Sequence, residues 1–333
     1  MAGQLDITES ARLSVAPMMD WTDRHCRFFH RQISKCTLLY TEMITAPALV
    51  RGGATHLLDY SAEEHPIAVQ LGGSDPAELA QATQMCTDHG YDEINLNVGC
   101  PSDRVQSGAF GAVLMKSPDL VAECVQAMAR ATTKPVTVKC RIGVDDQLPE
   151  QVLPDFIARM ADAGVTRMAI HARMAWLDGL SPKDNREIPP LNYPLVHEMK
   201  AKFPQLHLSI NGGLAGLQEA QTHLAAGMDG AMLGRAAYHT PWDVLADADR
   251  AIFGLTTPAQ TRFDVARAMI PYIEAHLARG GRMGQVTRHM LGLFTGQPGA
   301  RRYRQILSGE VHKPGAGPDV LEAALAAVEE QAA

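Results

Sequence analysis

The stretch EINLNVGCP at residues 93–101 starts as an alternating apolar run and ends in asparagine, glycine, cysteine and proline. Seven other runs have the same apolar start and polar or small end: SVAPM (14–18), LLYTEM (38–43), IAVQLGG (67–73), PVTVKCRIG (135–143), RMAIHAR (167–173), HLSINGG (207–213) and GAMLGRAA (230–237). Helix-like stretches such as 75–89 and 118–132 lie between them, and strands that alternate with helices form parallel sheets. Eight such units predict a TIM (β/α)8 barrel of the α/β class, whose strand ends form one active-site rim.

The alternative to a closed barrel is an open, doubly wound sheet. Such a sheet often carries a G-x-G-x-x-G turn after an early strand, and no such turn follows the early runs here. Beyond about residue 255 the strand runs stop, and only helical spacing remains, over 261–278, 285–294, 300–307 and 318–333. The sequence therefore predicts a barrel domain over 1–255 and an all-helical domain over 256–333, ending in a solvated helix.

Charge is distributed unevenly along the chain. The net charge is −7, but residues 262–313 contain nine basic and three acidic side chains, whereas residues 1–261 contain 21 basic and 30 acidic ones. A basic lobe on an acidic body can steer a polyanion to one side of a molecule. Arg301, Arg302 and Arg304 cluster on an expected helix in this lobe. They predict nucleic-acid binding, with an ordinary solvated face as the alternative.

Cysteine usage and hydropathy point to an intracellular protein. The six cysteines form no C-x-x-C pair and stand near no histidine cluster, so no metal site is expected. The first residues lack a basic segment followed by an apolar run, and no uncharged apolar stretch reaches the roughly 18 residues that a membrane span needs. We therefore expect a cytoplasmic protein with reduced thiols, no membrane partner and, by default, a monomeric state.

Cys100 is the strongest candidate for a catalytic residue. Gly99 permits a tight turn before it and Pro101 restricts the backbone after it, so the thiol is held at a strand end. The segment from there to Met115 is rich in glycine and is expected to form a mobile loop over the site. Thiols are mostly protonated at neutral pH and can act as general acids. The alternatives are an activated thiolate nucleophile and an ordinary core cysteine.

Other strand ends suggest a site for a flat, phosphorylated cofactor. A lysine inside an apolar strand is costly unless it meets an anion, and glycines expose backbone N–H groups that bind phosphate. TIM barrels often place phosphate at the last two strands. The candidates for cofactor contacts are Pro17, Met18, Met19, Gln70, Lys139, His171, Asn211, Gly212, Gly213, Gly234 and Arg235.

Taken together, motifs from the first strand run to the last resemble the tRNA-dihydrouridine synthase family. They are APMMDWTDRHCR (16–27), TEMI (41–44), QLGG (70–73), NLNVGCPS (95–102), VKCRIG (138–143), HAR (171–173), NGG (211–213) and LGRAAY (233–238). Residues 175–200 and the segment GQPGARRYRQIL at 296–307 resemble the A subfamily. The resemblance implies bound FMN, NADPH or NADH as the reductant, and reduction of uridines 20 and 20a in the D-loop of tRNA.

The resemblance also implies roles for individual residues. It gives Cys100 the role of proton donor to C5 of the base, with hydride from FMN, and it places FMN against the eleven candidates named above. It implies tRNA contacts at Asn97, Lys183, Arg186, Arg301 and Arg304. One departure is Met174, where many relatives carry lysine, so no basic RNA contact is expected there.

Two other functions remain open at this point. A small-molecule flavin reductase of the dihydroorotate-dehydrogenase type would share the phosphate corner and the cysteine, but it gives no reason for the basic helical lobe. A non-catalytic tRNA-binding protein that has kept the barrel would need no flavin.

Overall fold

The computed structural model describes residues 5–102, 110–256, 258 and 260–332. Eight parallel strands close into a barrel in sequence order, so the predicted TIM barrel is confirmed. The strands are β1 (Leu13–Val15), β2 (Leu38–Thr45), β3 (Ile67–Gly72), β4 (Glu93–Val98), β5 (Val136–Arg141), β6 (Arg167–His171), β7 (His207–Asn211) and β8 (Gly230–Leu233).

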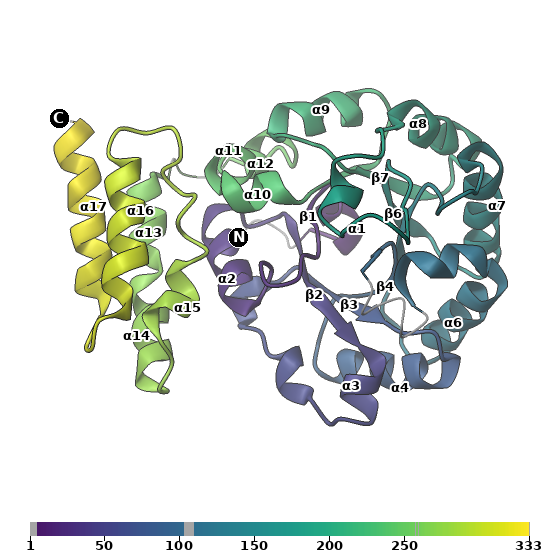
Figure 1. Ribbon diagram of the computed structural model, residues 1–333, viewed down its shortest axis with the longest axis horizontal. Coiled ribbons are helices and arrows are strands. Elements are labelled where there is room, and N and C mark those ends of the chain that lie inside the picture. Colours follow the sequence, from purple (N-terminus) through teal and green to yellow (C-terminus); the bar gives the residue numbers. More distant parts are fainter. Residues whose placement is uncertain (1–4, 103–109, 257, 259, 333) are drawn as a thin grey trace.

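Helices surround this barrel (Figure 1). They are α2 (Arg24–Ile33), α3 (Ala46–Val50), α4 (Pro76–Asp88), α6 (Pro118–Arg130), α7 (Pro149–Asp162), α8 (Tyr193–Lys202), α9 (Leu217–Ala225), α10 (Arg235–His239), α11 (Pro241–Leu245) and α12 (Ala248–Ala251). The short helix α1 (Ile7–Ser10) is not part of this ring, and its Ile7 packs against inward-facing residues of the barrel. No described helix is both long enough and apolar enough to cross a bilayer.

Two apolar clusters divide the barrel core. The larger one joins outward-facing strand residues such as Ile94, Leu96 and Val98 to the surrounding helices. A smaller one contains inward residues, including Tyr40, Ala68 and Met232. The alternating partners of the outward residues on β4 are buried and polar, so this barrel is filled partly by hydrogen-bonded side chains rather than by apolar ones alone.

Five further helices follow the barrel and lie to one side of it, next to α2 (Figure 1). They are α13 (Arg262–Ala268), α14 (Ile270–Ala278), α15 (Met283–Thr287), α16 (Ala300–Gly309) and α17 (Pro318–Ala332). No strand lies among the described residues beyond 255, which agrees with the all-helical prediction for this part of the chain.

Three details of the helical prediction are wrong. The helix expected over 261–278 is divided at Met269, because Pro271 in the first turn of α14 lacks the N–H that a continuous helix needs. Of the helix expected over 285–294, only the part up to Thr287 is helical. The turns that follow pack against the barrel so closely that a Cβ on Gly292 would lie 2.4 Å from the carbonyl oxygen of His239.

The last helix is not a solvated appendage. Its residues Leu321, Ala324, Leu325 and Val328 are almost fully buried. Gly299 precedes α16 with a φ of 78°, and a Cβ there would lie 2.7 Å from the Cα of Val328. This approach allows α16 and α17 to pack against each other, and the apolar spacing of α17 is therefore a core face.

Helix α2 joins the barrel to the C-terminal helices. Asp23 caps α2 by accepting hydrogen bonds from the backbone N–H groups of His25 and Cys26, at 2.9 and 3.0 Å. The same carboxylate binds Arg288 at 2.5 Å and His289 at 3.0 Å. Burial alone would raise the pKa of Asp23, but its bonds to His289, Cys26 and Arg288 outweigh burial and hold that pKa well below its usual range. One carboxylate thus stabilises both the start of α2 and the contact between the barrel and the C-terminal part of the chain.

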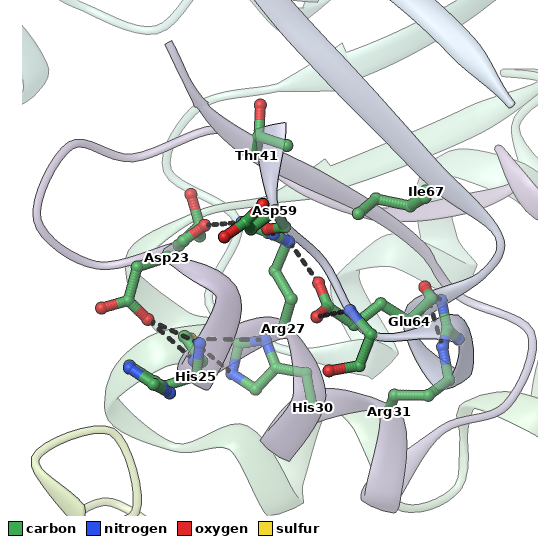
Figure 2. A network of polar contacts seen from close by, with 12 residues as sticks. Asp23, His25, Arg27, His30, Arg31, Thr41, Asp59, Glu64 and Ile67 are labelled. Carbon is green, nitrogen blue, oxygen red and sulfur yellow. Dashed lines mark hydrogen bonds and ion pairs between the residues drawn. The ribbon is translucent and has the colours of Figure 1, made fainter. Parts of the chain in front are cut away.

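The other face of α2 is tied to the barrel by two buried arginines (Figure 2). Arg27 binds the Glu64 carboxylate at 2.7 Å and the carbonyl oxygen of Thr22 at 2.9 Å. Arg31 donates to the carbonyl oxygens of Ser34, Thr37, Glu64 and Pro66. Because a buried guanidinium is tolerated only when its donors are used, these contacts fix the position of α2.

Candidate functional site

A cavity of about 900 Å³ opens at the carboxyl ends of the strands. All eleven residues predicted to contact the cofactor line it, and so do Cys100, Asn97 and Arg186. Lys183, Arg301 and Arg304 are exposed and do not line it. The structure therefore brings the expected cofactor residues and the cysteine to one place, at the mouth where TIM barrels carry their active sites.

The register of the sheet explains this gathering. Neighbouring strands pair Gln70 with Asn95, Asn97 with Lys139, Arg141 with His171, and His171 with Asn211. In a closed parallel barrel, residues at the same level of successive strands meet on one rim. Polar strand ends that are far apart in the sequence consequently become neighbours.

Cys100 lies two residues beyond β4 and its thiol is free and half-buried. The backbone N–H groups of Gly99 and Cys100 both donate to Asn97 Oδ1, at 3.0 Å each. The N–H of Ala112 donates to the carbonyl oxygen of Cys100 at 2.9 Å. The turn that carries the thiol is therefore held on both sides, so the sulfur atom has a defined position in the cavity.

The loop expected to cover the site differs in part from the prediction. Residues 111–116 form a short 3-10 helix, η3 (Gly111–Lys116), in which Gly111, Ala112, Leu114 and Met115 are buried. This portion is packed rather than mobile, because its apolar residues join the main core. The remaining part, 103–109, lies outside the described residues.

Lys139 projects from β5 into the cavity. Burial, reinforced by the nearby Arg141 guanidinium, lowers the pKa of Lys139 to about 8. Within the described part of the chain its ammonium has no hydrogen-bond or ion-pair partner. Because even a half-buried charge is costly without a partner, this lysine suits an anionic ligand that the cavity would bind.

His171 has a similar unused group. Its Nε2 is buried and has no hydrogen-bond partner in the described ranges. Burial lowers the pKa of His171 well below its usual range, and the charges of Arg141 and Lys139 lower it further, so the ring is neutral at pH 7. Gly212, at a φ of 103°, makes room for the ring, since a Cβ there would lie 2.4 Å from His171 Cδ2. An unpaired buried ring nitrogen beside an unpaired ammonium fits a polar, anionic ring system such as a flavin.

The predicted phosphate site lies at the ends of β7 and β8. Its glycines are in place, but its arginine is already paired. Gly212 and Gly213 both adopt positive φ, and Asn211 Nδ2 donates to the carbonyl oxygen of Met232 at 2.7 Å. Arg235 already pairs with Glu187 at 2.6 Å on the half-exposed rim. A phosphate bound here would share Arg235 with that carboxylate.

Arg141 is a cavity residue that we did not select from the sequence. It donates to the carbonyl oxygens of Gly99, Met174 and Asn185, at 3.2, 3.0 and 2.8 Å. Burial lowers its pKa to about 10. Arg141 stands two positions after Lys139, so both side chains face the same side of β5. This spacing could have identified Arg141 as a cavity residue from the sequence. The side chain of Met174 packs against the core, with Sδ 2.9 Å from where a Cβ on Gly143 would lie.

The predicted tRNA contacts fall into two groups. Asn97 and Arg186 lie in the cavity; Asn97 is only 8% exposed, and its Nδ2 donates to Gln70 Oε1 at 2.8 Å. Lys183 is exposed on the loop that carries Arg186. Arg301 and Arg304 are exposed on α16, three residues apart, and thus share one face of that helix.

Comparisons with known proteins agree with this geometry. A family model described as dihydrouridine synthase (Dus) matches residues 14–329. The chain is 56% identical to the tRNA-dihydrouridine(20/20a) synthase of Vibrio cholerae, over 97% of this chain and 98% of that protein. It is also 56% identical to the Escherichia coli protein of the same name, over 98% of this chain and 94% of that one. A solved old yellow enzyme homologue from Zymomonas mobilis covers 75% of this chain and 90% of its own, with a TM-score of 0.52 and 14% identity, and this supports the barrel fold alone.

Proposed function

This chain belongs to the dihydrouridine synthase family, and from that premise we propose that it reduces uridines 20 and 20a of tRNA to 5,6-dihydrouridine with bound FMN. The observation that carries the proposal is the cavity itself. A free thiol, a half-buried ammonium and a buried imidazole nitrogen line one cavity at the barrel mouth, and neither nitrogen has a hydrogen-bond partner among the described residues. Membership of the family implies a flavin enzyme, and FMN is the flavin that these residues suit.

The cavity residues divide the work of holding FMN. Lys139 would place positive charge beside the flavin ring, and His171 Nε2 would offer the ring a hydrogen bond. The backbone N–H groups of Gly212 and Gly213 and the guanidinium of Arg235 would hold the FMN phosphate. The remaining predicted contacts, with the ring, are Pro17, Met18, Met19, Gln70, Asn211 and Gly234.

Cys100 is the residue that donates a proton in this proposal. The C5=C6 bond of uracil is conjugated with the C4 carbonyl group, so C6 accepts hydride and negative charge develops towards C5. No side chain can provide that hydride, so bound FMN would supply it, with NADPH or NADH as the source of the electrons. The Cys100 thiol then gives its proton to C5, and its turn, held by Asn97, sets the position of the sulfur.

The C-terminal helices have a role of their own in this proposal. The target base is stacked in a folded tRNA and must be extruded into the cavity. We assign residues 1–255 to catalysis and residues 256–333 to binding tRNA through its phosphates, with Lys183 and Arg186 on the rim between them. We take the working unit to be a monomer, and we propose a cytoplasmic location because the substrate in this proposal is tRNA.

Substrate choice tests the proposal directly. Purified protein loaded with FMN is given NADPH and either an unmodified tRNA transcript, free uridine or orotate. We expect dihydrouridine at positions 20 and 20a of the transcript, detected by mass spectrometry of nuclease fragments, and turnover at least about a hundredfold slower on the free pyrimidines. Faster turnover on orotate would establish the small-molecule reductase instead. A protein that takes up no FMN would point to the non-catalytic alternative.

The arginines of α16 allow a test of the tRNA-binding role. Changing Arg301 and Arg304 to alanine is expected to weaken tRNA binding and to reduce the slope of log K against log salt concentration by about two, one for each lost phosphate contact. Affinity is measured between 50 and 200 mM salt. The control is Arg130→Ala, at the exposed end of α6 on the barrel, which should leave the slope unchanged. An unaltered slope in the double variant would exclude phosphate contacts at these positions.

A further inference from the structure

A chain of side-chain hydrogen bonds runs down the inside of the barrel from the Cys100 turn. The backbone N–H of Cys100 donates to Asn97 Oδ1 at 3.0 Å. Asn97 Nδ2 donates to Gln70 Oε1 at 2.8 Å, and Gln70 Nε2 donates to Asn95 Oδ1 at 2.7 Å. Gln70 and Asn97 line the cavity, whereas Asn95 lies below it and is almost fully buried.

The chain continues to a buried ion pair at the barrel floor. Asn95 Nδ2 donates to Thr137 Oγ1 at 2.8 Å, and the Thr137 hydroxyl donates to Glu93 Oε1. Glu93 is fully buried and its other oxygen pairs with Arg167. Tyr40 also donates to Glu93 Oε1, at 2.7 Å. Both carboxylate oxygens of Glu93 therefore act as acceptors, Oε2 for Arg167 and Oε1 for Tyr40 and Thr137.

The donors and acceptors of this chain have one possible order. Because Glu93 only accepts, the single proton of the Thr137 hydroxyl must point down to it, and Thr137 can then only accept from Asn95. Asn95 must therefore turn its NH₂ group down and its oxygen up towards Gln70. From the top, the backbone N–H groups of Gly99 and Cys100 can only donate, which sets Asn97 independently. The two ends require the same order, so neither Gln70 nor Asn97 can flip its amide without breaking bonds.

We propose that Glu93, Thr137 and Asn95 are positioning residues, which act through this chain to fix the amides of Gln70 and Asn97 at the cavity and thereby the turn that carries Cys100. The inference rests on the proposed function and adds three residues to it that touch neither cofactor nor substrate. In the fixed order, Gln70 and Asn97 each keep one N–H for a ligand. The edge of the cavity consequently offers donors, which suit the carbonyl oxygens of a flavin ring or of uracil.

Thr137→Val tests the proposal because it removes the hydroxyl and keeps the shape. We expect the protein to fold, to bind FMN about tenfold more weakly, and to show a shifted visible spectrum of the bound flavin. kcat for tRNA should fall about tenfold with little change in KM, since the proton donor is misplaced after binding. Thr137→Ser, which restores the hydroxyl, should recover both the spectrum and kcat.

A matched control separates this effect from the loss of any buried hydroxyl. Thr83 on α4 has a buried Oγ1 without a hydrogen-bond partner among the described residues, so Thr83→Val should change neither flavin spectrum nor kcat. If Thr137→Val does not fold, Thr137→Cys replaces it, because a thiol of similar size is a far weaker donor and acceptor. A normal spectrum and normal kcat in a folded Thr137 variant would overturn the proposal.

A measurement on the flavin-free protein keeps this inference separate from the proposed function. The NMR resonances of the side-chain NH₂ groups of Gln70 and Asn97 show whether the hydrogen-bond chain is intact, and they require no turnover. We expect them to shift in the Thr137→Val protein, with NH₂ exchange faster by about tenfold, and to return in Thr137→Ser. Unchanged resonances would refute the positioning role even in an active enzyme. If the resonances shift but the original protein does not reduce tRNA, the positioning role of the hydrogen-bond chain is supported and the proposed function is refuted.

Discussion

Cys100→Ala is expected to bind FMN normally and to lose between about a hundredfold and ten-thousandfold in the reduction of tRNA, which is the range that one general acid contributes. The thiol lies in the cavity on a turn held by Asn97, and alanine keeps that turn because both hydrogen bonds come from the backbone. Reduction of the flavin by NADPH should be unaffected, since it needs no proton from this thiol. Stopped-flow absorbance of the flavin separates the two half-reactions.

The control is Cys86→Ala on α4, which removes a fully buried thiol far from the cavity lining. Burial raises the pKa of Cys86 to about 12, so that group is a permanent thiol with a packing role. We expect a small loss of stability and unchanged turnover in this variant. Dihydrouridine formation at a normal rate by Cys100→Ala would remove the proton-donor role from Cys100.

The second large effect concerns stability. Glu64→Gln should lower the free energy of unfolding by about 3–5 kcal/mol, because it leaves the buried Arg27 guanidinium without a counter-charge. Arg27 is 4% exposed and Glu64 is fully buried. The loss should appear in urea unfolding as a lower midpoint with an unchanged slope.

Two further variants sharpen this test. Glu63→Gln alters the exposed neighbour and should change stability by less than about 0.5 kcal/mol. The double variant Arg27→Met with Glu64→Leu replaces the pair by apolar groups and should recover much of the loss, since the cost lies in the uncompensated charge. A Glu64→Gln protein as stable as the original would show that water reaches Arg27.

The cavity illustrates what local pattern can and cannot predict. Every residue selected as a cofactor contact lines it, because each stands at the end of an apolar run, and strand ends share one rim in a parallel barrel. Arg141 was missed, although it lies two positions from Lys139 on the same strand. The pairing of Arg235 with Glu187 joins residues 48 positions apart, and nothing near either residue in the sequence indicates it.

The C-terminal helices show the same limit. Apolar spacing located them, but their ends and their exposure depended on neighbours. The segment 288–297 forms turns where it packs against the barrel, and α17 is a core helix because α16 covers it. Helical propensity is weak compared with such tertiary packing.

The sequence by itself determined the barrel, the all-helical end and the residues that line the cavity, because strand and helix periods, proline and glycine act over a few neighbouring positions. Only the tertiary structure decided how Glu93, Thr137 and Asn95 join Gln70, how Asp23 meets Arg288, and how Arg27 meets Glu64. A buried hydrogen bond or ion pair depends on where two distant segments are placed by the closed sheet, and that placement is a property of the whole fold.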